Sequence, residues 1–329
     1  MEHLRSWKEQ CSQRTVILRS LYLGGGTPSL LSKKSIECLM SGLDREGLHL
    51  GPQTEVTIEC NPESLTEEKV SGFKSAGINR ISLGVQSFQD VQLRRLERLA
   101  TRRHLQSSLE WIQKYFSNYS VDLMLGLPDQ TEALFEMDLK EILQLNPPHL
   151  SAYVLTLSED HVWKTAESMK SRMVGDDRVE KFYLQLISEL RGRGFEQYEV
   201  SNFAKPGFQS VHNTNYWDVE SSYLGLGPGA HGYLGKVRYE STRDPNDWMK
   251  SPHGIGSFEV LTREQQDLEK FYMELRTRKP AKIQDFRSAA IAALQQAGLI
   301  EIRPSEGVFT LTDRGWLLME SVAERLLPA

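Results

Sequence analysis

Residues 20–29 read SLYLGGGTPS: a short apolar strand candidate, Ser20–Leu23, runs directly into three glycines, a threonine and a proline. Glycine adopts the backbone conformations of tight turns and lets N–H groups approach a ligand closely. In parallel β/α folds, ligands gather at the carboxyl ends of the strands. The stretch therefore predicts a turn that cradles the amino-acid or phosphate-like end of a cofactor, with a plain structural turn as the alternative.

Beyond this turn, short apolar strands alternate with amphipathic helices, which predicts a parallel sheet built of βα units. One of the helices follows Ser64-Leu65-Thr66-Glu67, a sequence of the capping-box form. We expect a partial parallel β/α barrel, and a doubly wound open sheet is the alternative. The further strand candidates are Glu55–Cys60, Arg80–Val85, Ser120–Leu125, Leu150–Leu157 and Glu196–Phe203.

Both ends of the chain depart from this rhythm. Leu4, Trp7 and Cys11 have helical spacing, so the barrel is expected to open on a helix, with its first strand missing from the sequence. After a loop near residues 250–260, the C-terminal pattern predicts a small winged-helix-like α+β domain, for which structural cover is favoured over DNA binding. Its predicted segments are helices Glu264–Arg276 and Asp285–Ala297, the hairpin Ile300–Arg303 with Val308–Leu311, and helix Arg314–Leu326.

Three parts of the chain follow from these patterns. Residues 1–170 are expected to form the N-terminally truncated barrel, residues 171–255 to complete it, and residues 256–329 to form the winged-helix-like domain. The 329 residues are 39% hydrophobic and 25% charged, the composition of a globular protein with a sizeable core.

The charge and the cysteine content exclude several classes of protein. The formal net charge of −5 and the pI of about 6.0 argue against nucleic acid as a partner. No apolar run is long enough for a membrane span and the first residues lack a signal-peptide core, so we expect a cytoplasmic protein, with a peripheral position at the inner membrane left open. Three sparse cysteines, Cys11, Cys38 and Cys60, argue against a disulfide scaffold and are expected to be buried or indifferent thiols.

Polar side chains stand at equivalent positions along several strands. Glu59 lies near the end of the second strand candidate, Gln86 follows the third, and Asp122 lies in the fourth. Each of them alone is explained by turn formation. Together with the glycine-rich turn, two carboxylates and an amide suit a ligand that carries a ribose, an ammonium group and a carboxylate.

Several motifs resemble, in order and spacing, the radical S-adenosylmethionine proteins of the coproporphyrinogen III dehydrogenase group. The resemblance runs from about Tyr22 to the C-terminus. Within the group, His212-Asn213-Thr214-Asn215-Tyr216-Trp217 matches the HNxxYW signature of the haem chaperones of the HemW type. The other matching motifs are YLGGGTPS (22–29), IECNP (58–62), SLGVQSF (82–88), DLMLGLP (122–128) and YLGLGPGAH (223–231).

The resemblance implies an S-adenosylmethionine site in which the glycine-rich turn receives the amino-acid end of the cofactor. Arg98 is expected in the helix after the Gln86 strand, where its guanidinium group is able to hold a carboxylate through two hydrogen bonds. A solvated helix arginine is the alternative. The implied cofactor residues are Gly25, Gly26, Thr27, Glu59, Gln86, Arg98 and Asp122.

The resemblance also implies a [4Fe–4S] cluster held by a CxxxCxxC run just after the first barrel strand. The sequence contains no such run, and neither Cys11 nor Cys60 replaces it. We therefore expect no radical catalysis from these residues and assign no catalytic and no metal-ligating residue. The missing strand and cysteine run are expected to be encoded upstream of Met1, and a relative without the cluster is the alternative.

The HNxxYW segment is the implied haem region. Haem needs a flat apolar slot and an axial ligand, which is often histidine. The candidates are His212, Asn213, Tyr216 and Trp217, with His231 beyond them. The alternative is that His212 and Asn213 hydrogen-bond a tight loop beneath the barrel. The other six histidines are expected at the surface.

A haem-binding chaperone that delivers haem to haem-requiring proteins, such as respiratory enzymes in the membrane, is the function that the resemblance implies. Oxygen-independent decarboxylation of coproporphyrinogen III is the enzymatic alternative, and a scaffold that binds no tetrapyrrole is the third. The haem acceptor, the electron donor and the oligomeric state, a homodimer included, are left open.

Overall fold

The computed structural model describes residues 15–156, 171–250 and 254–327. The chain divides into two compact units. The first unit contains Met1–Leu21, Lys34–Glu55 and Ser210–Thr277, and the second contains Tyr22–Lys33, Val56–Gln209 and Arg278–Ala329. The predicted opening helix at Leu4, Trp7 and Cys11 lies outside the described residues, and the three-part division of the chain stays a prediction.

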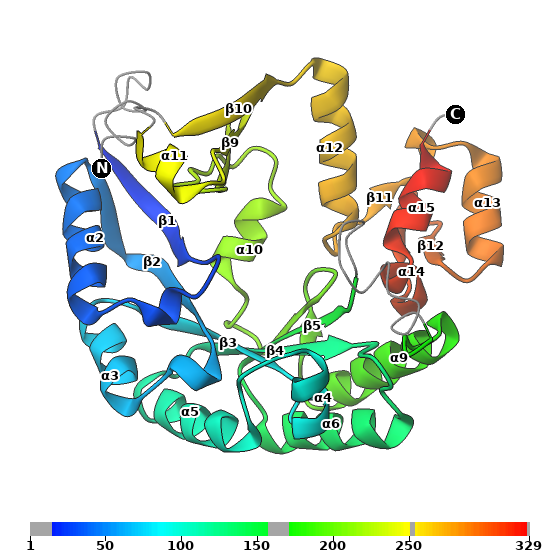
Figure 1. Ribbon diagram of the computed structural model, residues 1–329. Helices are drawn as coiled ribbons and strands as arrows, with labels where there is room; N and C mark the ends of the chain where they lie inside the picture. The colour runs from blue at the N-terminus through cyan, green and yellow to red at the C-terminus, as the bar shows by residue number, and fades with distance from the viewer. Residues whose placement is uncertain (1–14, 157–170, 251–253, 328–329) are drawn as a thin grey trace. The chain divides into compact units, whose positions relative to one another are not determined.

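Among the described residues, seven strands form one sheet in the order β1-β2-β3-β4-β5-β7-β6. Strands β2 to β5 pair in parallel, whereas β5 pairs with β7, and β7 with β6, in antiparallel fashion. The mostly parallel sheet confirms the prediction of a partial β/α barrel (Figure 1). The bounds are β1 Val16–Leu23, β2 Leu48–Cys60, β3 Arg80–Gln86, β4 Tyr119–Leu125, β5 His149–Val154, β6 Glu196–Gln197 and β7 Asn202–Ala204.

The prediction of one continuous strand over Glu196–Phe203 is wrong, because the chain turns back within it. The Asn202 N–H bonds to the Glu199 carbonyl, and the Asn202 side-chain amide donates to the Glu199 carboxylate. This local hydrogen bonding makes a turn, and β6 and β7 pair with each other across it.

Helices of the second unit cover the outer face of the parallel strands (Figure 1). Phe135 and Phe182 stack between two of these helices with ring centroids 4.4 Å apart, and both are fully buried. The helix after β2 is capped by Thr66, whose hydroxyl accepts from the Lys69 N–H, and not by the predicted Ser64. The bounds are α3 Glu67–Ser75, α4 Asp90–Arg95, α5 Arg102–Tyr115, α6 Glu132–Leu145 and α9 Asp176–Gly192.

The C-terminal segment of the second unit contains the second helix, the hairpin and the last helix of the predicted winged-helix-like pattern, whereas the predicted helix Glu264–Arg276 falls in the first unit. Its hairpin has the predicted bounds, and a short third strand makes a sheet of order β11-β13-β12. The last helix, predicted as continuous over Arg314–Leu326, is broken at Leu318, and both Trp316 before the break and Val322 after it are buried. The bounds are β11 Ala281–Lys282, α13 Ser288–Gln296, β12 Ile300–Arg303, β13 Val308–Leu311, α14 Asp313–Leu317 and α15 Met319–Leu326.

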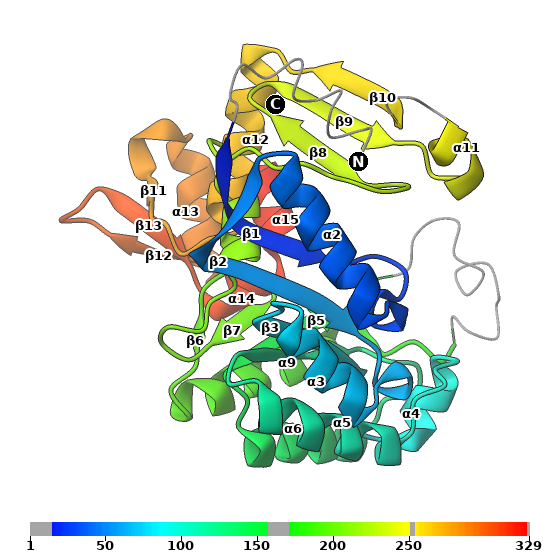
Figure 2. The same cartoon turned by 90° about the vertical axis from the view of Figure 1, so that its left-hand side faces the viewer.

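The first unit packs α2 against the beginnings of β1 and β2, with Leu43 and Leu48 at the centre of the contact. Its other part is an antiparallel sheet of order β10-β9-β8 (Figure 2). The loop predicted near residues 250–260 is wrong for its second half, because β10 pairs there with β9. The bounds are α2 Lys33–Arg45, α10 Val211–Tyr216, β8 His231–Leu234, β9 Val237–Ser241, α11 Pro245–Lys250, β10 Ile255–Val260 and α12 Arg263–Leu275.

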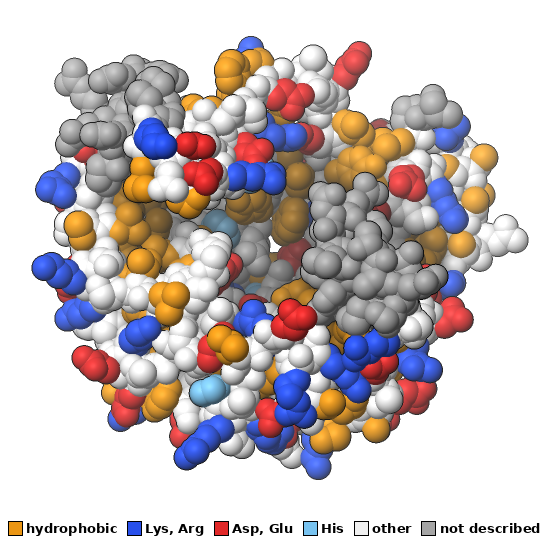
Figure 3. Space-filling view, in the orientation of Figure 1, with side chains coloured by type: hydrophobic (Ala, Val, Ile, Leu, Met, Phe, Trp, Pro, Cys, Tyr) orange, Lys and Arg blue, Asp and Glu red, His pale blue; other side chains and the backbone are white. Residues whose placement is uncertain are grey.

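The surface carries mixed charge. On the face shown in Figure 3, basic and acidic side chains are interspersed, as 39 lysines and arginines against 44 acidic residues lead one to expect. Within the part of the chain that the structure describes, none of the helices has the length and apolar character needed to cross a membrane.

Candidate functional site

The glycine-rich turn follows β1 in the second unit and faces the end of β2. Gly25 and Gly26 have φ angles of 77° and 61°, in the left-handed region that favours glycine. The Gly25 N–H donates to Glu59 Oε2 at 3.0 Å, and the Tyr22 hydroxyl donates to Glu59 Oε1 at 2.8 Å. The turn and the predicted carboxylate are therefore joined directly, and burial beside Glu59 raises the pKa of Tyr22.

A buried serine holds the turn in place. Ser29 Oγ lies 2.6 Å from Ser64 Oγ and accepts the Asn61 N–H at 3.2 Å. The Lys69 ammonium donates to the carbonyl oxygens of both Ser29 and Ser64. These contacts, made by residues of the GGGTPS and ECNP motifs, fix the exposed Gly25 against the end of β2.

Gln86, the last residue of β3, lies beside Arg98. Gln86 has a φ of 66° where the register of β3 against β4 shifts, and its Oε1 accepts the Tyr153 hydroxyl at 2.7 Å. The Arg98 guanidinium donates to Asn61 Oδ1 at 2.8 Å. A Cβ on Gly84 would stand 3.2 Å from Gln86 Nε2 and 3.6 Å from Arg98, so the glycine leaves room for both side chains.

The prediction that Arg98 belongs to a helix is wrong. Helix α4 ends at Arg95, and Glu97, with a φ of 56°, turns the chain so that the Arg98 N–H bonds to the Leu93 carbonyl. Arg98 is thereby directed to Asn61 instead of standing in a row of solvated helix arginines.

Asp138 on α6 supports the loop that follows Gln86. Its carboxylate accepts the Ser87 hydroxyl at 2.7 Å, the Phe88 N–H at 2.8 Å and the Gln89 amide at 3.1 Å. Burial raises the pKa of Asp138 to about 6 although the three hydrogen bonds act to lower it. This support was missed by sequence reasoning, because Asp138 lies in an ordinary amphipathic helix pattern.

Asp122 in β4 is the second carboxylate of the predicted set. The Ser82 hydroxyl donates to Asp122 Oδ1 at 3.2 Å. Burial raises the pKa of Asp122 to about 6, and the neighbouring Glu59 carboxylate acts in the same direction, while Ser151, Ser82 and Arg80 act to lower it. Asp122 and Glu59 are therefore close enough to influence each other electrostatically.

The residues of this site suit S-adenosylmethionine. The Arg98 Nε atom is buried and has no hydrogen-bond partner among the described residues, so the guanidinium keeps an unused donor for a ligand carboxylate. Nothing lies within 4 Å of the positions that Cβ atoms on Gly25 and Gly26 would occupy, so a polar group is able to approach the backbone there. The cofactor role of these residues and of Thr27 stays a prediction.

The [4Fe–4S] cluster does not fit the residues present. Cys38 is exposed on α2 and Cys60 is buried at the end of β2, where burial raises the pKa of its thiol. Cys11 lies outside the described residues. Within the described ranges, no group of three histidine, cysteine or acidic side chains is arranged to hold a metal ion.

The HNxxYW segment forms α10 in the first unit and is attached to β2 by one buried carboxylate. Glu55 accepts the Val211 N–H and the His212 N–H, each at 3.0 Å, and the Ser210 hydroxyl at 3.3 Å. Ser210 in turn caps the helix by accepting the Asn213 N–H at 3.2 Å. Sequence reasoning missed Glu55, although an acidic residue at the start of an apolar strand was the available signal.

A row of aromatic rings begins on this helix. The His212 and Tyr216 rings are 5.1 Å apart and edge-on, the Tyr216 and Tyr223 rings are 4.5 Å apart, and Tyr223 lies 6.2 Å from Tyr233. Tyr216 is 37% exposed, so part of this row is accessible to solvent.

Trp217 lies under the Arg276 guanidinium, which stands 5.3 Å from the ring. Its Nε1 atom is buried without a hydrogen-bond partner in the residues that the structure describes. His231 is exposed at the start of β8, 3.9 Å from the Glu240 carboxylate. Of the predicted haem residues, His212 and Tyr216 are thus in ring contact, whereas His231 makes its described contact with Glu240.

The glycines before and after His231 serve packing. A Cβ on Gly225 would stand 2.0 Å from the His231 carbonyl oxygen, and a Cβ on Gly232 would stand 2.0 Å from the Tyr239 ring. The buried Tyr239 hydroxyl bonds to both the N–H and the carbonyl of Gly225. These contacts hold the segment around Gly225 against β8 and β9, beside the isolated β-bridge between Tyr223 and Tyr233.

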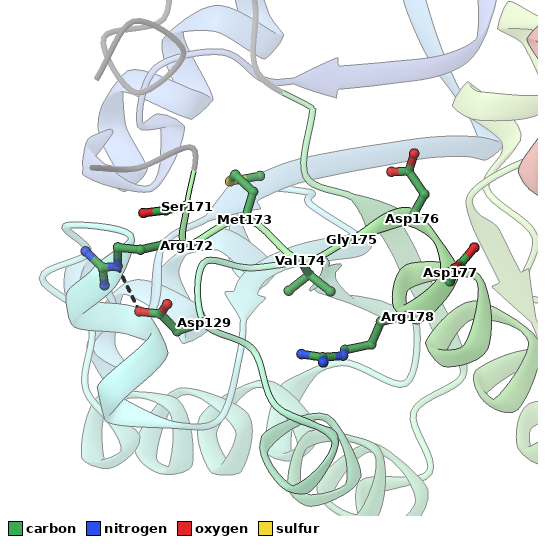
Figure 4. Close-up of a pocket in the computed structure, with 9 residues that line it drawn as sticks. All are labelled: Asp129, Ser171, Arg172, Met173, Val174, Gly175, Asp176, Asp177 and Arg178. Carbon is green, nitrogen blue, oxygen red and sulfur yellow. Dashed lines mark hydrogen bonds and ion pairs between the residues drawn. The ribbon is translucent and has the colours of Figure 1, made fainter. Parts of the chain in front are cut away.

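A hollow of about 720 Å³ lies between the loop after β4 and the start of α9 (Figure 4). Asp129, with a φ of 51°, pairs there with Arg172 at 2.8 Å and lies 3.6 Å from Arg95. The contacts between these side chains fix the GLPDQ loop, and no predicted site residue lines the hollow.

Known proteins resemble the chain over most of its length. The model of the Radical SAM superfamily matches residues 5–145. A protein named Heme chaperone HemW from Lactococcus lactis subsp. lactis (strain IL1403) is 32% identical over 323 residues, which cover 94% of this chain and 85% of that protein. The chain belongs to the HemW family of radical S-adenosylmethionine proteins.

Further relatives agree with this family. Heme chaperone HemW from Bacillus subtilis (strain 168) is 33% identical over 325 residues, covering 93% of this chain and 84% of that protein. The solved structure of coproporphyrinogen III oxidase (HemN) from Escherichia coli superposes with a TM-score of 0.81 at 20% identity, covering 99% of this chain and 81% of the other. At that identity the superposition shows a common fold, and it confirms the predicted radical S-adenosylmethionine type of barrel.

Proposed function

We propose that the chain binds haem and passes it to haem-requiring proteins, respiratory enzymes among them. The observation that carries the proposal is the row of rings at His212, Tyr216 and Tyr223, which stands on the HNxxYW segment in a member of the HemW family. A flat macrocycle stacks favourably on exposed tyrosine faces, and histidine is a common axial ligand of haem iron.

The two groups of residues have different tasks in this proposal. In the first unit, Glu55 holds α10 while Tyr216 and His212 contact the haem. In the second unit, the glycine-rich turn and Arg98 bind the amino-acid end of S-adenosylmethionine, and Glu59, Gln86 and Asp122 accept or donate hydrogen bonds to the rest of it. S-adenosylmethionine brings a sulfonium cation and an amino-acid zwitterion to the site, and the residues named bind and orient it.

Haem transfer tests the proposal. The haem-loaded chain is mixed with a haem-free acceptor enzyme, and both the loss of the chain's Soret band and the gain of acceptor activity are followed. We expect transfer with the wild type and slower loading with Tyr216→Ala. Absence of transfer from a chain that holds haem, or conversion of coproporphyrinogen III by the anaerobically purified chain, contradicts the proposal. Equilibrium dialysis with labelled S-adenosylmethionine tests the cofactor site separately.

A further inference from the structure

His149 is buried in the second unit, and the expectation that it lies at the surface is wrong. It is the first residue of β5 and is 0% exposed. Its Nδ1 lies 2.7 Å from Ser120 Oγ, and its Nε2 lies 2.7 Å from the Tyr198 hydroxyl. Both ring nitrogens are therefore engaged within the barrel by groups on other strands and turns.

The hydrogen bonds continue from Ser120 to the predicted cofactor carboxylate. Ser120 stands opposite His149 in the register of β4 and β5, and Asp122 stands opposite Ser151 two residues further along. Ser120 Oγ donates to Asp122 Oδ1 at 3.5 Å and lies 3.1 Å from Ser151 Oγ, and Ser151 also hydrogen-bonds the Asp122 carboxylate. A continuous chain thus runs from Tyr198 through His149 and Ser120 to Asp122.

The tautomer of His149 sets the direction of these hydrogen bonds. A serine hydroxyl has one hydrogen, so Ser120 donates to Asp122 only when it accepts at the other side from His149 Nδ1–H. A neutral imidazole with its proton on Nδ1 accepts at Nε2, and Tyr198 O–H is the donor there. The reverse tautomer makes Ser120 donate to His149 and removes its hydrogen bond from Asp122.

We propose that His149 is a positioning residue for the S-adenosylmethionine site: held as the Nδ1–H tautomer by Tyr198, it directs the Ser120 hydroxyl to the Asp122 carboxylate. This row of hydrogen bonds keeps Asp122 ionised and fixed, ready to accept hydrogen bonds from the ligand. The role given to His149 rests on the proposed S-adenosylmethionine site, whereas its geometry rests on the buried hydrogen bonds alone.

The charges around these hydrogen bonds agree with a neutral His149 and an ionised Asp122. Burial, with Arg80 nearby, holds the pKa of His149 well below its usual value, so the ring is neutral. Asp122, with a pKa of about 6, is mostly ionised at neutral pH, and loss of one donor leaves more of it protonated. The titratable and charged groups that act on Asp122 are Tyr22 on β1, Glu59 on β2, Arg80 on β3 and Tyr153 on β5.

Nuclear magnetic resonance of the full chain tests both parts of the proposal without any ligand. Nitrogen-15 spectra of the histidine ring report the tautomer of His149. Carbon-13 spectra of the aspartate carboxyls, with Asp122→Asn to assign the signal, report the pKa of Asp122. Tyr198→Phe removes the hydroxyl that bonds to His149 Nε2, and Tyr183→Phe removes a buried hydroxyl that bonds instead to Gln197 and Val200.

We expect His149 to carry its proton on Nδ1 in the wild type. We also expect Tyr198→Phe to raise the pKa of Asp122 by about half a unit, because the hydrogen bonds of such a chain strengthen one another, and Tyr183→Phe to leave it unchanged. A proton on Nε2, or equal effects of the two substitutions, overturns the proposal. A chain that fails to bind S-adenosylmethionine overturns the proposed cofactor site instead, and the two failures are distinct.

Discussion

Replacement of Glu55 by glutamine tests how the haem region is held. Glu55 is 6% exposed and accepts two backbone N–H groups at the start of α10 and the hydroxyl of Ser210. Glu55→Gln keeps the shape of the side chain and one acceptor oxygen, but the second oxygen becomes an amide that faces a donor. One N–H of α10 therefore loses its partner.

The free energy lost on Glu55→Gln follows from these three hydrogen bonds. A hydrogen bond to a charged group contributes about 1.5–3 kcal/mol and a neutral one about 1 kcal/mol, so the lost charge and the unpaired N–H together weaken the attachment of α10 by about 3 kcal/mol. Water that reaches the freed N–H recovers about half of this, which leaves about 1.5 kcal/mol. Because about 1.4 kcal/mol is a factor of ten, we expect the dissociation constant for haem to rise about tenfold.

Spectrophotometric haem titration measures the effect, and urea unfolding monitors the fold. Glu67→Gln is the matched control, because the same change is made at an exposed carboxylate of α3 that pairs with Lys114. A dissociation constant for Glu55→Gln within a factor of two of both the wild type and Glu67→Gln refutes the argument that Glu55 positions the haem region.

Three further substitutions probe other parts of the structure. Tyr22→Phe removes a donor to Glu59 and is expected to weaken S-adenosylmethionine binding by about 1 kcal/mol in equilibrium dialysis; unchanged affinity means that Tyr22 does not orient Glu59. Burial raises the pKa of Asp138 from 3.8 to about 6, so the folded state holds the carboxyl proton more tightly than the unfolded state. The free energy of unfolding therefore falls by about 3 kcal/mol as pH rises from about 4 to 6. Asp138→Asn flattens this part of the pH dependence of urea unfolding, and an unaltered profile contradicts it. Gly232→Ala forces a Cβ into the Tyr239 ring and is expected to lower the melting temperature by several degrees, whereas Gly192→Ala, where the position is open, is not.

The sequence predicts the features that depend on local pattern. Apolar runs located the strands β1 to β5, and the C-terminal hairpin was predicted with its bounds because alternating residues flank a turn there. The glycine-rich turn and Glu59 were predicted separately as parts of one site, and the structure joins Gly25 to Glu59 by a hydrogen bond. Parallel strands bring such positions to one edge, so this juxtaposition follows from the order of elements alone.

Features that depend on distant contacts were not predicted. Arg98 was expected in a helix, but the left-handed Glu97 turns it towards Asn61, which lies 37 positions away in the chain. Nothing in the local sequence around His149 marks it as enclosed, and only the pairing of β4 with β5 and the return of the chain at Tyr198 bury it. Glu55 acts on residues more than 150 positions away, a distance over which periodicity carries no information.

Haem titration of the purified full chain shows whether the His212–Tyr216 segment binds haem. We expect a saturable Soret band with one haem bound per chain, weakened by His212→Ala and by Tyr216→Ala and unchanged by Glu67→Gln. Absence of a Soret shift in excess protein, or a band that neither substitution alters, contradicts the claim that the His212–Tyr216 segment binds haem.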